Sequence, residues 1–245
     1  MNTVIIGATS AIATTFARLQ AQKPDANLYL MARNQQQLED LAEDLKARGA
    51  ASVHIACADM AENNYLSVLE RLLENCEKID LVLMAHGILG DQAQCEKDVM
   101  ALEQLMQINT LSSMKLLTVL ANRLEQQKSG TLAFISSVAG DRGRASNYAY
   151  GASKAAVTTF LQGMRVRLLR VGANVVIVKP GFVDTPMTAD FDKSGPLWAQ
   201  PQTIAAGIEK AVEKRKGIVY LPWFWRYIML IIIHIPGRVF NKLNL

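Results

Sequence analysis

A tyrosine and a lysine stand four residues apart in the stretch Tyr-Gly-Ala-Ser-Lys, at Tyr150 and Lys154. Side chains four residues apart on a helix lie on the same face, one turn from each other. An ammonium group close to a phenol favours the phenolate and lowers the phenol's pKa from its usual value of about 10. A phenol tuned in this way can exchange a proton with a substrate near neutral pH.

A serine upstream can hold the oxygen atom to which that proton moves. Ser137 lies in the run Phe-Ile-Ser-Ser-Val-Ala-Gly, thirteen residues before Tyr150. The trio suits the reversible interconversion of an alcohol and a ketone. Two neighbours, Ser136 and Tyr148, compete for the same roles, but the residue four beyond Tyr148 is an alanine. A tyrosine–lysine pair alone also occurs on ordinary exposed helices. The neighbouring motifs therefore decide whether this pair is catalytic.

Short apolar runs alternate along the chain with longer segments that have helical periodicity. Continuous apolar strands separated by helices are typical of a parallel sheet covered on both faces. We therefore expect one α/β domain with a Rossmann-like, doubly wound sheet of about seven strands, which suits a chain of 245 residues. The expected strands are 4–6, 28–31, 53–56, 81–84, 132–135, 175–178 and 218–221, and the expected helices are 11–23, 35–48, 65–75, 98–123 and 153–171.

Composition narrows the class of protein. Half of the residues are hydrophobic, and the net charge of +4 is too small and diffuse to indicate a nucleic-acid partner. The three cysteines have no metal-ligand spacing, so we expect reduced thiols and no metal site. No basic leader precedes the first strand, which indicates a cytoplasmic protein.

The first expected strand runs into Gly-Ala-Thr-Ser-Ala-Ile-Ala, from Gly7 to Ala13. A glycine turn that opens a helix binds phosphate through free N–H groups and the helix dipole. Ala11 and Ala13 stand where further glycines are often found, so the loop also suits an ordinary turn.

The second and third strands end in residues suited to the adenosine half of a dinucleotide. An acidic residue after the second strand would bind the ribose hydroxyls of NAD. The chain has Ala32 and then Arg33, and a guanidinium there suits the extra phosphate of NADP. We expect NADPH/NADP, without excluding NADH; the alternative is a surface arginine. Asp59, after the third strand, can accept a hydrogen bond from the adenine amino group.

In their order and spacing, these motifs resemble the short-chain dehydrogenase/reductase family over residues 3–221. The resemblance implies an enzyme that reduces a ketone with hydride from NAD(P)H, often as a homodimer or homotetramer. Tyr150 matches the proton donor, Ser137 the group that binds the substrate oxygen, and Lys154 the residue that lowers the tyrosine pKa and binds the nicotinamide ribose. Asn109 matches the residue that supports a water-linked proton relay to the lysine.

The resemblance also implies a set of cofactor-binding residues beside the catalytic pair. They are Gly7, Thr9, Ser10, Ala11, Ile12, Arg33, Asp59, Met60, Ala85, Gly87, Pro180, Gly181, Val183 and Thr185. The chain departs from the family pattern after the fourth strand, where Met-Ala-His-Gly replaces the usual Asn-Asn-Ala-Gly. We interpret His86 in this stretch as a structural histidine beside the cofactor.

The loop between Ser137 and Tyr150 must lie beside the reacting carbonyl, since both its ends belong to the site. Arg142, Arg144 and Asn147 are therefore candidate substrate residues. Guanidinium groups pair well with phosphate, so the arginines suit an anionic substrate. The alternative is that they pair with acidic side chains or face solvent.

Residues 222–245 form an aromatic and apolar extension beyond a catalytic domain of residues 1–221. Its apolar run is shorter than the roughly 20 residues that span a bilayer. We expect a helix lying in the membrane interface, with Arg226, Arg238 and Lys242 meeting headgroups. Alternatively, the extension packs on a partner subunit or covers the substrate cleft.

The loop and the extension together resemble one branch of the family, the keto-reductases that act with decaprenylphosphoryl-ribose epimerase. That branch reduces a keto-pentose carried on a polyprenyl phosphate. The resemblance implies a lipid-linked ketone in cell-envelope glycan biosynthesis, at the inner face of the cytoplasmic membrane. Two alternatives stay open: a soluble reductase of a 3-oxoacyl thioester, steroid or small ketone, and a non-catalytic dinucleotide-binding sensor.

Overall fold

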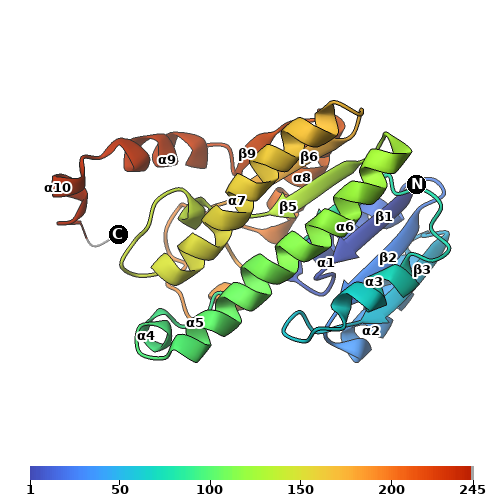
Figure 1. Ribbon diagram of the computed structural model, residues 1–245, viewed down its shortest axis with the longest axis horizontal. Coiled ribbons are helices and arrows are strands. Elements are labelled where there is room, and N and C mark those ends of the chain that lie inside the picture. The colour runs from blue at the N-terminus through green and yellow to red at the C-terminus, as the bar shows by residue number, and fades with distance from the viewer. Residues whose placement is uncertain (244–245) are drawn as a thin grey trace.

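A parallel sheet of seven strands forms the centre of the protein in the computed structural model, which describes residues 1–243 (Figure 1). In space the strands follow the order β3-β2-β1-β4-β5-β6-β9, and every neighbouring pair is parallel. Their bounds are β1 Asn2–Ile6, β2 Asn27–Ala32, β3 Ser52–Cys57, β4 Leu81–Met84, β5 Thr131–Ile135, β6 Asn174–Pro180 and β9 Ile218–Leu221. The order reverses between β1 and β4, which is where ligands bind in doubly wound sheets.

Helices cover both faces of the sheet, as Figure 1 shows. One face carries α3 (Tyr65–Leu72), α6 (Ser112–Gln127) and α7 (Tyr148–Leu169), whose apolar side chains form one core cluster with the strands. The other face carries α1 (Ala11–Ala21), α2 (Gln35–Ala47) and α8 (Pro201–Glu213), which form the second cluster. Because apolar side chains pack on both faces, the central strands consist of nearly continuous apolar residues.

Shorter elements complete the chain. Before α6 lie α4 (Gln92–Cys95), α5 (Val99–Met106) and a π-helix, Gln107–Leu111. A 3-10 turn, Val138–Gly140, follows β5, and another, Pro186–Thr188, follows β7 (Phe182–Val183), which pairs with β8 (Trp198–Ala199). The chain then continues beyond β9 into α9 (Trp225–His234) and α10 (Gly237–Phe240), which project from one end of the molecule (Figure 1).

The expected fold class and all seven expected strands are confirmed, with several strand ends longer by one or two residues. Three helix boundaries were wrong by three residues or more: the helix expected from residue 153 begins at Tyr148, the one expected to end at residue 123 continues to Gln127, and the one expected to end at residue 75 ends at Leu72. Asn147, a residue type that is preferred at the N-cap, directly precedes Tyr148 but makes no side-chain capping hydrogen bond. The earlier start places Tyr150 and Lys154 on one helix.

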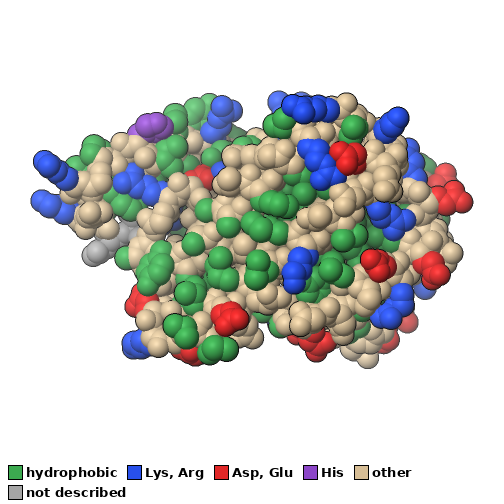
Figure 2. Space-filling model, viewed as in Figure 1, with side chains coloured by type: hydrophobic (Ala, Val, Ile, Leu, Met, Phe, Trp, Pro, Cys, Tyr) green, Lys and Arg blue, Asp and Glu red, His purple; other side chains and the backbone are tan. Residues whose placement is uncertain are grey.

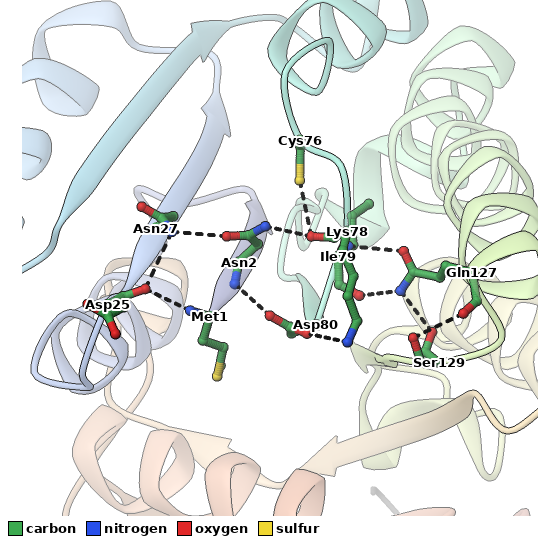
Figure 3. A network of polar contacts seen from close by, with 10 residues as sticks. All are labelled: Met1, Asn2, Asp25, Asn27, Cys76, Lys78, Ile79, Asp80, Gln127 and Ser129. Atoms are coloured by element: carbon green, nitrogen blue, oxygen red, sulfur yellow. Dashed lines mark hydrogen bonds and ion pairs between the residues drawn. The ribbon is translucent and has the colours of Figure 1, made fainter.

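A network of hydrogen bonds stabilises the amino-terminal edge of the sheet, that is, the side where the strands begin, opposite their carboxyl ends (Figure 3). The backbone N–H of Asn2 donates to Asp80, 2.8 Å away, and the Asn2 amide donates to the carbonyl of Lys78. Gln127 exchanges two hydrogen bonds with the backbone of Ile79. These bonds satisfy backbone groups where the strands begin, so this edge stabilises the fold while the opposite edge carries the site.

The turn after β1 touches the end of β4. Gly7 has a φ of +77°, and a Cβ atom there would lie 2.5 Å from the backbone nitrogen of His86. Only a residue without a side chain allows this approach. The contact joins the two strands that border the switch point of the sheet.

Replacing Gly7 by alanine should lower the free energy of unfolding by about 2 kcal/mol or more, because the methyl group meets backbone and the positive φ is strained. Gly163 is the matched control. It lies inside α7, where an added Cβ atom has nothing within 4 Å. Gly163→Ala should stabilise the protein by about 0.5–1 kcal/mol. Urea unfolding measures both; a Gly7→Ala protein as stable as the unmodified one contradicts the close approach.

Candidate active site

The carboxyl ends of the strands open into one cleft of about 740 Å³. Its lining comes from the segments that follow β1 to β6, on both sides of the switch point. This is the position and size of a typical cofactor and substrate site.

The structure brings almost every predicted site residue to this cleft. All fourteen predicted cofactor residues line it, together with Ser137, Arg144, Asn147, Tyr150 and Lys154. Asn109 and Arg142 do not line it. The cleft also contains residues that the sequence did not single out, among them Asn34, Gln37, Phe182, Met187 and Phe191.

The turn at Gly7 and the start of α1 make a cradle for an anion. Ser10 caps α1, and its side chain accepts a hydrogen bond from the backbone of Ala13. The first N–H groups of a helix have no partner within it and attract negative charge. The cradle therefore fits the pyrophosphate of a dinucleotide although the glycine pattern is incomplete.

The adenosine end of the cleft is polar and open. Arg33 is exposed at the end of β2, and Asn34 beside it caps α2 through a 3.0 Å hydrogen bond to the N–H of Gln37. Asp59 accepts a hydrogen bond from the N–H of Ala61, which leaves its second oxygen for another donor. A helix-capping asparagine directly after Arg33 was a readable signal for this part of the site.

Tyr150 and Lys154 both lie on α7. Ser137 follows β5 and directly precedes the turn Val138–Gly140. Lys154 is 4% exposed, and its Nζ donates to the carbonyl of Ile135 at 3.1 Å. The same Nζ lies 5.7 Å from the centre of the Tyr150 ring. The ammonium is thus near the phenol but is bound to the sheet.

The pKa values differ from the sequence-based expectation for Tyr150. Burial raises the pKa of Tyr150 to about 12, and a hydrogen bond with Ser137 acts in the opposite direction. Burial also lowers the pKa of Lys154 to about 8. The expected lowering of the tyrosine pKa is therefore wrong for this structure, because desolvation outweighs the ammonium held at Ile135. At neutral pH Tyr150 is a phenol that carries a proton to donate.

Asn109 lies in the π-helix and is fully buried. Its amide exchanges two 2.8 Å hydrogen bonds with the backbone of Ile88 and donates to Ser153 at 3.1 Å. These bonds fasten the segment after β4 to α7, next to Lys154. The relay implied by the family resemblance stays a prediction for this residue.

The competing residues have other surroundings. The Ser136 hydroxyl is buried and lies 2.7 Å from that of Thr158, whereas Tyr148 is 46% exposed and outside the cleft. His86 places Nε2 within 3.1 Å of the hydroxyls of Ser112 and Ser113. Burial, helped by the charge of Lys154, lowers the pKa of His86 to about 3, so it stays neutral.

The substrate end holds two buried polar atoms without partners among the described residues, Arg144 Nε and Asn147 Oδ1. Burial lowers the pKa of Arg144, an effect that the charge of Asp141 opposes. Arg142 points elsewhere: its guanidinium donates to the carbonyls of Ile232 and Ile235 in the extension. Its expected place beside the substrate was wrong because a contact 90 residues away in the sequence holds it.

The extension has an inner and an outer face. Trp225 and Met229 of α9 are buried against Val138 and neighbouring apolar residues. On the outer face, Leu230 is 54% exposed and Ile231 is 67% exposed. Within residues 1–243, no helix is long and apolar enough to cross a membrane.

Lys154→Met should stabilise the protein at pH 7 while reducing ketone reduction at least about a hundredfold. The unfolded chain holds the lysine proton up to a pKa of 10.5, whereas the folded protein releases it above about 8. The buried lysine therefore costs stability below pH 8, and this cost falls as the pH rises. We expect a gain of about 1–3 kcal/mol at pH 7 that shrinks by about 1 kcal/mol at pH 9.

Tyr150→Phe serves as the control for that measurement. It also removes the proposed proton donor and should abolish reduction while leaving NADPH binding intact. Its effect on unfolding should be the same at pH 7 and pH 9, because the phenol is neutral in both states. A pH-independent effect of Lys154→Met contradicts the depressed lysine pKa.

Comparison with known proteins identifies the family. Residues 1–195 match the family model described as short chain dehydrogenase. An uncharacterized oxidoreductase of Mycobacterium tuberculosis (strain ATCC 25618 / H37Rv) is 34% identical over 98% of this chain and 96% of its own length. The ketoacyl reductase HetN of Nostoc sp. is 28% identical, over 86% of this chain and 75% of that protein.

A solved structure has the same fold. It is a short-chain dehydrogenase from Sphingobium yanoikuyae in complex with NADPH, with a TM-score of 0.84, 24% identity and 97% coverage of both chains. The family match and the oxidoreductase relatives agree with the geometry of the cleft. The chain belongs to the short-chain dehydrogenase family, whose members are NAD(P)-dependent oxidoreductases.

Proposed function

We propose that this protein uses NADPH to reduce the ketone of a sugar carried on a polyprenyl phosphate, at the inner face of the cytoplasmic membrane. The observation that carries the proposal is the position of α9. Its inner face packs beside the segment that follows Ser137, and its outer face presents apolar side chains. A surface suited to lipid thus adjoins the substrate end of the cleft.

The residues of the cleft suit carbonyl reduction. NADPH, when bound, supplies the hydride. Ser137 orients the carbonyl oxygen, and Tyr150 donates a proton to it as negative charge develops. Lys154 contributes a positive charge beside the phenol, which stabilises the phenolate left after proton transfer. With its pKa near 8, Lys154 is mostly charged at neutral pH.

Arg144 and Asn147 support an anionic, hydroxylated substrate. A buried polar atom without a partner costs free energy, so both residues favour a ligand that supplies one. Arg144 offers a donor suited to phosphate, and Asn147 offers an acceptor suited to a sugar hydroxyl. A plain hydrocarbon ketone satisfies neither atom.

The outer surface of the extension supports membrane binding. Trp223 and Tyr227 are 71% and 59% exposed, and aromatic side chains favour the interface of a bilayer. Arg226, Arg238 and Lys242 are exposed on the same segment, and Figure 2 shows basic side chains gathered over α9 and α10. Apolar and basic groups together bind anionic lipid surfaces.

A second candidate is a soluble reductase of a 3-oxoacyl thioester or small ketone. It is favoured by the relative that is named a ketoacyl reductase. A homodimer or homotetramer suits either candidate, because α5 to α7 expose apolar side chains (Figure 2). These include Val99, Met100, Leu111 and Val166. A third, lower-ranked candidate is a non-catalytic dinucleotide-binding sensor. If the protein were such a sensor, its function in the cell should survive Tyr150→Phe.

The substrate test compares a keto-pentose on a polyprenyl phosphate, presented in anionic vesicles, with soluble ketones and a 3-oxoacyl thioester. We expect the highest kcat/KM for the lipid-linked ketone. The double variant Leu230→Glu/Ile231→Glu should lower that value at least about tenfold, since two apolar side chains no longer enter the lipid and the added carboxylates are repelled by anionic headgroups. Reduction of any soluble ketone should stay within about twofold.

Met100→Glu is the matched control, because Met100 is 65% exposed on α5, away from the extension. It should change neither activity nor vesicle binding. Efficient reduction of soluble ketones with none of the lipid-linked ketone rules out the proposed substrate. Equal activity of the double variant on vesicles rules out α9 as the membrane contact.

Cofactor preference is tested at Arg33. Arg33→Ala should lower kcat/KM for NADPH by about ten- to a hundredfold, because a charge-assisted bond to the extra phosphate is lost. The value for NADH should change less than about threefold. An unmodified enzyme that prefers NADH contradicts this assignment.

A further inference from the structure

The loop of residues 141–147 is attached to the extension by Arg142. Its Nη1 donates to the carbonyl of Ile232 at 2.5 Å and to that of Ile235 at 2.7 Å. The guanidinium carbon lies 3.7 Å from the centre of the Phe240 ring. One side chain therefore binds the end of α9 and the last residue of α10.

This attachment has a clear physical basis. The last carbonyls of a helix have no partner within it and carry partial negative charge. A planar guanidinium can donate to such carbonyls and stack on an aromatic ring at the same time. Arg142 thus satisfies the carboxyl end of α9 from outside the helix.

The residue before Arg142 anchors the loop to the sheet. The Asp141 carboxylate forms a buried ion pair with Lys179 of β6 and accepts a 2.8 Å hydrogen bond from the hydroxyl of Tyr220 in β9. The Asp141 and Lys179 side chains are 8% and 7% exposed. The base of the loop is therefore fixed, and Arg142 holds the next part of it against α9.

The same loop carries the polar atoms of the substrate end. Arg144 contacts the Met229 sulfur of α9 at 3.5 Å and lines the cleft, as does Asn147. Arg142 itself does not line the cleft. Its effect on substrate must therefore pass through α9 and the loop.

We propose that Arg142 is a positioning residue: by clamping α9 onto the loop, it holds Arg144 and Asn147 in place for substrate binding. We expect the clamp to act mainly on the ketone site, because most predicted cofactor residues come from the turns after other strands. The exceptions are α7, which follows the loop, and Gly181, where an added Cβ atom would lie 1.9 Å from the Trp225 ring of α9. The proposal rests on ketone reduction at Tyr150 and does not depend on which ketone is the substrate.

Arg142→Ala tests the clamp in the full chain, with a ketone from the panel above that the unmodified protein reduces. We expect KM for the ketone to rise at least about tenfold, with kcat within about threefold and the NADPH dissociation constant within about twofold, because a lost ground-state contact acts mainly on KM. Arg142→Lys should recover part of the loss, since an ammonium donates to the carbonyls but lacks the planar fork.

Arg123→Ala is the matched control. Arg123 also donates to backbone carbonyls, those of Leu73 and Cys76, but away from the cleft. It should lower the melting temperature without changing KM. The positioning role is overturned if KM is unchanged in Arg142→Ala. It is also overturned if KM rises only together with losses of kcat, NADPH affinity and stability.

Hydrogen exchange tests the clamp without any substrate. In Arg142→Ala, backbone amides of 225–234 and of 141–147 should exchange faster, while those of α1 stay unchanged. Exchange that rises in neither segment, or in α9 alone, overturns the proposal. If only soluble ketones react in the substrate comparison, the proposed lipid-linked substrate is ruled out. The role of Arg142 can still be tested with one of those soluble ketones.

Discussion

The burial of Lys154 is the constraint on which the rest of the active site depends. A charge with one carbonyl partner and 4% exposure needs close packing on every side. Gly87 approaches it so closely that an added Cβ atom would lie 3.4 Å from Nζ. A Cβ atom on Gly140 would meet the backbone of Ala155 at 2.9 Å, so the turn after Ser137 packs directly on α7. The proposed role of Lys154 in ketone reduction accounts for a destabilising group at this position, a common exchange of stability for function.

The amino ends and the carboxyl ends of the strands, here called the two edges of the sheet, have different roles. The amino-terminal edge uses polar side chains to complete backbone hydrogen bonds, as Asn2 and Gln127 do. The carboxyl edge leaves polar atoms free to meet ligands, as at Arg144 and Asn147. Parallel strands require this arrangement, since all their carboxyl ends meet on one side.

Much of the fold and the cleft was predictable, because buried parallel strands are continuous apolar runs and the cleft residues directly follow them.

The errors involve contacts between distant parts of the chain. The pKa of Tyr150 depends on burial by residues that local sequence does not reveal. Arg142 has partners about 90 residues away, so local reading placed it at the substrate. The start of α7 was missed although an asparagine, a preferred N-cap residue, directly precedes it. The extension lies beyond residues 1–195, which match the family model, but the Mycobacterium tuberculosis relative aligns with 98% of the chain and therefore covers most of the extension as well.

The bond between Arg142 and α9 also joins segments that are made at different times during synthesis. Chains emerge from the ribosome amino end first, so early segments exist before later ones. The strands up to β6 and their helices provide most of the dinucleotide cleft. The substrate end gains its wall only after residues 232 and 235 have been made. The residues predicted to bind the dinucleotide are therefore present in the nascent chain before the segment that holds the predicted ketone site in place.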